Sequence, residues 1–254
     1  MVTRDATLVV LTEDTGTSGW QPVVACVKAL CDCLVQGIDW SRLHILPRAD
    51  APEAVLHAVG ANRWKHSGKD GHDGQLNLAR YLADQLMGEP EVPRFVFFHV
   101  DADRRWGDAA PDALENVKQF DRLVRNKVRH HLAAALAKKG RASDLDARMA
   151  RLHLLVPYSA VEAWLYQNTE VAQRLCAERT CAGAHSVQYR AWAEDRTRLD
   201  TIAQLKGRRD LHCLEDRDKL ALARGLPHRA MYAAGRSFYA AVEAAGDDGA
   251  LLHA

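Results

Sequence analysis

The stretch from Phe95 to Asp103 constrains the fold more than any other part of the chain. It reads FVFFHVDAD, an apolar run of aromatic and β-branched residues that ends abruptly in two carboxylates. A short, continuous apolar run of this kind is typical of a parallel strand that helices cover on both faces. In open α/β sheets, ligands bind at the carboxyl ends of the strands. The run therefore predicts a buried central strand with Asp101 and Asp103 at the functional edge of a sheet.

Three other short segments have the composition of strands, namely Ala6–Thr12, Leu43–Leu46 and residues 152–156. The segments between them carry apolar residues at helical spacing, most clearly at residues 20–35, 75–87 and 112–139, the last with a break. Strands that alternate with helices form parallel sheets through right-handed crossovers. We therefore expect an α/β fold with an open, mostly parallel sheet of about four strands and helices on both faces.

The last predicted strand ends near Val156, and the rest of the chain has mostly helical patterns. We expect an α/β domain over residues 1–168 and a helical C-terminal region over residues 169–254 that packs on it.

Earlier in the chain, residues 66–73 contain two His and two Asp with irregular spacing. We interpret that stretch as a flexible surface loop rather than a metal site.

Composition excludes some classes of protein and leaves others open. A formal net charge of +1 neither requires nor excludes a nucleic-acid partner. The sequence has no signal-peptide pattern and no apolar run near the ~20 residues that span a bilayer. Its six cysteines lack the spacing of a zinc knuckle, so we expect reduced thiols. Together these features predict a cytoplasmic protein with no membrane partner.

Carboxylates follow three of the predicted strands. Glu13 comes directly after the first strand, Asp101 and Asp103 follow the central one, and Glu162 lies one turn into the helix after the fourth. Since residues that follow parallel strands emerge at one edge, these side chains can converge, and a divalent cation would relieve their repulsion. Hard oxygen ligands favour Mg²⁺ or Mn²⁺. Alternatively, each is a cap or loop residue, and Glu162 completes a capping box with Ser159.

Basic residues also surround the predicted edge. Arg104 directly follows the two aspartates, where a guanidinium group would clamp a phosphate or neutralise the carboxylates. The predicted helix after it carries a run of basic residues, among them Arg122, Arg125, Lys127 and Arg129. Such a run is either a solvated helix face or a track for nucleic acid.

The acidic residue after LVVLT (residues 8–12) and the DxD in VDAD (residues 100–103) resemble the motifs of the Toprim domain. That domain is the α/β metal-binding module of topoisomerases, primases and OLD-family nucleases. A closer resemblance is to small bacterial Toprim-like proteins of the RloB type, which are often associated with defence ATPases. Their third motif is similar to VPYSAVEAWL (residues 156–165), and their late lysine to Lys219 in DKLALA.

The resemblance implies metal-dependent cleavage or transfer of phosphodiester bonds in DNA or RNA. By this resemblance Asp101 and Asp103 hold Mg²⁺, Glu13 serves as ligand or general base, and Glu162 completes a second metal position. Lys219 would stabilise the leaving oxygen or the pentacoordinate phosphate. The sequence has no GxxxxGK[ST] motif, so ATP hydrolysis would come from an ATPase partner. A homo-oligomer is also compatible with the resemblance.

Two alternatives remain open at this point. Asp14 stands where the family usually has a glycine, and His99 stands where such strands carry an apolar or small residue. These departures favour a second reading, a catalytically inactive Toprim-like subunit that binds nucleic acid or a protein. The third is a metal-dependent phosphohydrolase that acts on small nucleotides. The absence of GxGxxG after the first strand argues against a dinucleotide-binding domain.

Overall fold

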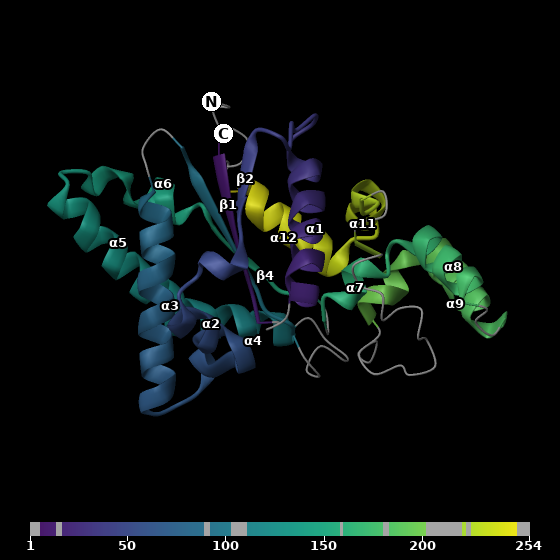
Figure 1. Cartoon of the computed structure of the whole chain (residues 1–254), viewed down its shortest axis with the longest axis horizontal. Coiled ribbons are helices and arrows are strands. Elements are labelled where there is room, and N and C mark those ends of the chain that lie inside the picture. The colour runs from purple at the N-terminus through teal and green to yellow at the C-terminus, as the bar shows by residue number, and fades with distance from the viewer. Residues whose placement is uncertain are drawn as a thin grey trace.

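The computed structural model describes residues 6–13, 17–88, 92–102, 111–157, 160–179, 183–201, 220–221 and 225–247. Its centre is one sheet of four parallel strands in the order β2-β1-β3-β4 (Figure 1). The strands are β1 (Ala6–Thr12), β2 (Leu43–Leu46), β3 (Arg94–His99) and β4 (Leu152–Leu155). The predicted α/β class, the four parallel strands and the helical C-terminal region are therefore confirmed.

Alternation along the two central strands divides the core into two layers. Leu8, Val10 and Phe97 point to one face of the sheet, where α1 (Thr17–Leu34) and α12 (Arg236–Asp247) pack. Val9 and Phe98 point to the other face, under α2 (Glu53–Val59), α3 (Lys69–Met87) and α5 (Asn126–Lys138). Figure 1 shows these helices on the two sides of the sheet. Because both faces are covered, β1 and β3 read as continuous apolar runs rather than alternating ones.

The long helix after β3 has the break that its sequence predicts. It consists of α4 (Pro111–Phe120), a π-helical turn at Asp121–Arg125 and α5. A π-helical turn accommodates an extra residue and changes the direction in which later side chains point. Val124 in the turn and Val128 in α5 are both fully buried against the core beneath α3.

The interpretation of residues 66–73 as a loop is wrong for its second half, because α3 begins at Lys69. Gly68 ends the preceding segment at φ 88°, a conformation that favours glycine. A Cβ at Gly71 would lie 2.0 Å from the carbonyl oxygen of His66, so only glycine fits this approach. The polar side chains of the first turn of α3 face solvent, which explains the loop-like composition.

Short elements connect the strands to the longer helices. The 3₁₀ segments are η1 (Arg48–Asp50), η2 (Gly60–Lys65), η5 (Ala142–Asp144) and η6 (Arg196–Thr201). Two short α-helices flank β4, with α6 (Leu145–Met149) before it and α7 (Glu162–Leu165) after it.

The C-terminal region contains α8 (Thr169–Glu178), α9 (Gly183–Glu194), α11 (His228–Ala233) and α12. Of these, α12 lies against α1 and β4, so its Phe238 and Val242 share a core with Leu8 and Phe97 of the sheet. The indole N–H of Trp164 on α7 donates to Ser237 Oγ at 2.9 Å. Among the residues described, no helix is long and apolar enough to cross a membrane.

Candidate metal site at the carboxyl ends of the strands

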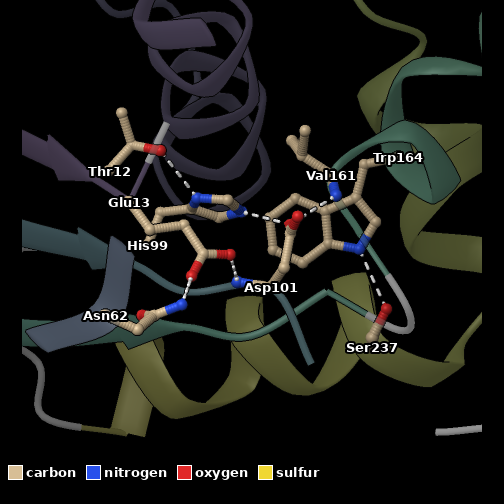
Figure 2. A network of polar contacts seen from close by, with 8 residues as sticks. All are labelled: Thr12, Glu13, Asn62, His99, Asp101, Val161, Trp164 and Ser237. Carbon is tan, nitrogen blue, oxygen red and sulfur yellow. Dashed lines mark hydrogen bonds and ion pairs between the residues drawn. The ribbon is translucent and has the colours of Figure 1, made fainter. Parts of the chain in front are cut away.

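The pairing of β1 with β3 brings Glu13 and Asp101 together. Thr12 lies opposite His99 in the ladder, so both chains leave the sheet at the same level. Glu13 Oε1 then accepts a hydrogen bond from the backbone N–H of Asp101, with 2.7 Å between nitrogen and oxygen (Figure 2). Residues 88 positions apart in the chain are thus joined directly at the edge where parallel sheets present ligands.

The second oxygen of Glu13 is held from another part of the chain. Its Oε2 accepts a hydrogen bond from the side-chain amide of Asn62, which lies in η2 between α2 and α3 (Figure 2). Both carboxylate oxygens therefore have donors, while each keeps a further lone pair. The half-buried Glu13 carboxylate is fixed in orientation by these two contacts.

Asp101 is only 3% exposed and is held on the opposite side of the cluster. Its Oδ1 accepts from the backbone N–H of Val161 at 2.9 Å and lies 3.3 Å from His99 Nε2. The other ring nitrogen of His99 is 2.9 Å from Thr12 Oγ1. Figure 2 shows the resulting chain of contacts from Thr12 through His99 to Asp101 and Val161.

The contact from Val161 to Asp101 also bears on the predicted capping box. The first turn of α7 begins at Glu162, and the residue before it, Val161, makes no side-chain cap of its own. The backbone N–H of Val161 at this helix start donates to the carboxylate of Asp101, 60 positions earlier. Ser159, the predicted cap, lies outside the described residues.

The electrostatics of the cluster favour a cation. Burial raises the pKa of Glu13, and the nearby charge of Asp101 raises it further. His99, the amide of Asn62 and the N–H of Asp101 lower the pKa of Glu13, with smaller effects. Adjacent carboxylates in a desolvated position repel each other unless a positive ion compensates them. The carboxylate oxygens of Glu13 and Asp101 are the kind of ligand that Mg²⁺ and Mn²⁺ prefer.

Glu162 is buried as well, at 3% exposure, on the face of α7 that meets α1. Its charge contributes, after burial, to a raised pKa of the Cys26 thiol on α1. Glu162 thus directly follows Val161, whose backbone N–H donates to Asp101, and it lies beside α1.

Asp103, Arg104 and Lys219 lie outside the described residues, so their predicted roles stay predictions. Within the part of the chain that is described, no three His, Cys, Asp or Glu side chains form a group suited to a metal ion. The described contribution to the predicted site is the pair formed by Glu13 and Asp101.

Sequence reasoning missed two members of the cluster, Asn62 and Thr12. Thr12 had a usable signal, because it is the last residue of the first predicted strand and directly precedes Glu13. Asn62 had none, since it lies in a short polar segment whose position depends on how α2 and α3 pack.

The basic run on the long helix is largely engaged with other protein groups. Arg125 and Arg129 form ion pairs at 2.7 Å with Asp121 and at 2.6 Å with Asp146. Lys127 turns inward and donates to Gln75 Oε1 at 2.9 Å. The ion pairs of Arg125 and Arg129 favour the solvated-face interpretation for these two residues, whereas Lys127 does not belong to that face.

A cavity of about 710 Å³ lies on another part of the surface, between α1 and residues 225–230. Its described lining includes Lys28, Trp40 and Leu226, and it includes neither Glu13 nor Asp101. This cavity is therefore separate from the carboxylate cluster. The cluster is the candidate site because of its chemistry and not because of a large cavity.

Comparisons with known proteins returned no matches. No family model, no curated protein and no solved structure matches the chain. The geometry of the cluster is accordingly the basis for any functional inference.

Proposed function

We propose that this chain is a divalent-metal-dependent nuclease of the Toprim type, which hydrolyses phosphodiester bonds in DNA or RNA. In this proposal it works in the cytoplasm, alone or as a homo-oligomer, as a defence effector beside an ATPase partner. The proposal depends most on one observation, the direct contact between Glu13 and Asp101 at the carboxyl ends of β1 and β3. The sequence motifs predict that pair, and the parallel pairing of β1 with β3 supports it.

In this proposal Glu13, Asp101 and Asp103 hold Mg²⁺ or Mn²⁺. The bound ion supplies charge stabilisation at the phosphate and lowers the pKa of a water molecule. Asn62 and the N–H of Asp101 orient the Glu13 carboxylate, and Val161 and His99 orient that of Asp101. The roles proposed for Arg104, Lys219 and Glu162 are phosphate clamping, stabilisation of the leaving oxygen and a second metal position.

The test is cleavage of supercoiled plasmid, single-stranded DNA and RNA in the presence of Mn²⁺ or Mg²⁺. Wild type is compared with the isosteric variants Glu13→Gln and Asp101→Asn, and with Glu178→Gln as control. Glu178 is an exposed glutamate on α8 that takes no part in the cluster. We expect cleavage to fall by at least about 100-fold in the two site variants and to stay unchanged in the control.

The substrate panel and a binding measurement separate the alternatives. Cleavage that survives in both site variants would refute the proposed site. Hydrolysis of mononucleotides without cleavage of polymers would point to the small-nucleotide phosphohydrolase instead.

A catalytically inactive Toprim-like binding subunit is the second candidate, and one observation favours it. Asp101 is almost fully buried, and its Oδ1 already contacts the N–H of Val161 and the ring of His99. A carboxylate engaged in this way also serves as a structural link between β3 and α7. Calorimetry of the folded wild type with Mn²⁺ decides between the two roles. Binding of Mn²⁺ favours the metal site, and no binding favours a purely structural role for Asp101.

A further inference from the structure

Asn62 reaches the carboxylate cluster from a part of the chain that none of the sequence motifs includes. It lies in η2, and its side-chain amide donates to Glu13 Oε2 across 49 positions of sequence. Figure 2 shows the amide pointing at the carboxylate from the side opposite His99. The contact connects the segment between α2 and α3 to the end of β1.

The backbone of Asn62 has an uncommon conformation. Its φ is 54°, in the left-handed region, and among the described non-glycine residues only Arg236, at 62°, shares a positive value. Asparagine tolerates this region better than most residues, yet the conformation persists only where its surroundings hold it. Here it directs the short side chain toward Glu13.

The orientation of the amide satisfies Glu13 rather than Asn62 itself. Asn62 Oδ1 is buried and has no hydrogen-bond partner among the described residues. Rotation of the amide by half a turn would place this oxygen against the Glu13 carboxylate and remove the donated hydrogen bond. An ionised Glu13 therefore fixes the amide with its N–H₂ group inward, even though the carbonyl oxygen stays unsatisfied.

We propose that Asn62 is a positioning residue of the metal centre. Its Nδ2 holds Oε2 of Glu13, so that the remaining lone pairs of the carboxylate are oriented toward a cation shared with Asp101. This inference rests on the metal site of the proposed function, but not on nuclease activity. Residues that hydrogen-bond a ligating carboxylate usually change metal affinity by about 10- to 100-fold when they are removed.

The experiment is a calorimetric titration of the full chain with Mn²⁺. Asn62→Gly removes the amide while it keeps a backbone that adopts the left-handed region easily. We expect about 10- to 100-fold weaker Mn²⁺ binding by this variant. Arg236→Gly makes the same kind of change at the other left-handed position, the first residue of α12, and is expected to leave the affinity unchanged. Circular dichroism verifies that each variant is folded.

A second pair of variants tests whether Asn62 acts through Glu13. Glu13→Asp keeps a carboxylate but withdraws it from the amide, so binding is weaker. Asn62→Gly on that background is expected to cause less than about threefold further loss, because coupled residues are not additive. Additive losses, or wild-type affinity in Asn62→Gly, would overturn the inference.

The outcomes also separate this inference from the proposed function. A wild type that binds Mn²⁺ but cuts no nucleic acid contradicts the nuclease, and the affinities of the variants still decide the role of Asn62. A wild type that binds no Mn²⁺ contradicts the metal centre and this inference with it.

Discussion

At the amino ends of β3 and β4 a buried arginine is surrounded by oxygen atoms, whereas the carboxyl ends of β1 and β3 gather carboxylates. Arg148 on α6, only 4% exposed, donates to the backbone oxygens of Leu86, at 2.6 Å, and Met87 at the end of α3. Asp144 lies 3.9 Å from its guanidinium group. At the other end, Glu13 and Asp101 share one cluster whose described members include no Lys or Arg.

Under the proposed function, the difference separates a structural role at one end from a metal-binding role at the other. Buried charges that only stabilise a fold are normally compensated by partners of opposite sign or by backbone groups. Arg148 has such partners in Asp144 and in the two carbonyl groups at the end of α3, and it links α3 to α6. Burial and then the nearby Arg141 and Arg151 still lower its pKa. The Glu13 carboxylate is not fully compensated, as its raised pKa indicates. Incomplete compensation of this kind is common at functional sites and is relieved by a bound cation.

The largest expected effect on stability is at the compensated end. Arg148→Met keeps an apolar stem but leaves the carbonyl groups of Leu86 and Met87 without their donor. We expect a loss of about 2 to 4 kcal/mol in the free energy of unfolding, because buried acceptors stay unsatisfied. Urea denaturation measures it. Mn²⁺ affinity is expected to stay unchanged, and a large loss of affinity would contradict the separation of the two ends.

A pH effect of similar size is expected from His153 on β4. Burial and, to a smaller extent, the nearby Arg125 lower the pKa of His153 to about 4. Since the folded pKa is below the ordinary value of 6.5, the stability from the neutral ring is complete above pH 6.5. It is lost as the pH falls toward 4, by about 3 kcal/mol in total.

Denaturation of wild type and His153→Leu across this pH range tests that expectation. The unfolding free energy of wild type should fall relative to that of His153→Leu as the pH falls toward 4. The exposed His130→Gln serves as control. A constant difference would show that His153 keeps an ordinary pKa in the folded chain.

At the uncompensated end, removal of charge is expected to stabilise the metal-free protein. The pKa of Glu13 is raised on folding, so its contribution is favourable below the ordinary carboxyl pKa and is lost as the pH rises through the folded pKa. At neutral pH the ionised side chain therefore costs stability. Glu13→Gln removes this charge but also turns an N–H₂ group toward one of the two donors of the carboxylate. The expected result is therefore a trend with pH, in which the unfolding free energy of the variant relative to wild type rises by about 1 kcal/mol toward neutral pH.

Thermal unfolding with and without Mn²⁺ measures this effect. The unfolding free energy of Glu13→Gln relative to wild type should increase from pH 4.5 to 7 in the absence of metal. Mn²⁺ should raise the melting temperature of wild type and not that of the variant. A relative free energy that does not change over this pH range would show that Glu13 keeps an ordinary pKa in the folded chain.

The smallest effect is expected on the surface of α5. Arg129 pairs with Asp146 at 2.6 Å, but the two side chains are 49% and 83% exposed. Exposed ion pairs contribute about 0 to 1 kcal/mol. Arg129→Ala is expected to change unfolding by less than about 1 kcal/mol and to leave Mn²⁺ affinity unchanged. A filter-binding assay with single-stranded DNA shows whether this side chain also contributes to a nucleic-acid track.

Much of the architecture could be predicted from periodicity. The apolar runs at β1 and β3 have the pattern of strands buried on both faces, and all four strands lie within one residue of their predicted limits. The first turn of α3 could not be predicted in this way. Its polar residues carry no helical stripe, and the close approach of Gly71 to His66 depends on the fold.

The sequence by itself determined that carboxylates follow β1 and β3, since each is adjacent to a strand that its own composition defines. Which groups hold those carboxylates was decided only by the tertiary structure. Asn62 meets Glu13, and Val161 meets Asp101, because the packing of α2 and α3 and the start of α7 bring these residues to the same edge. Strand patterns are local and can be read along the chain, whereas these hydrogen bonds join residues 49 and 60 positions apart. Contacts of that range exist only once the whole sheet and its helices are assembled.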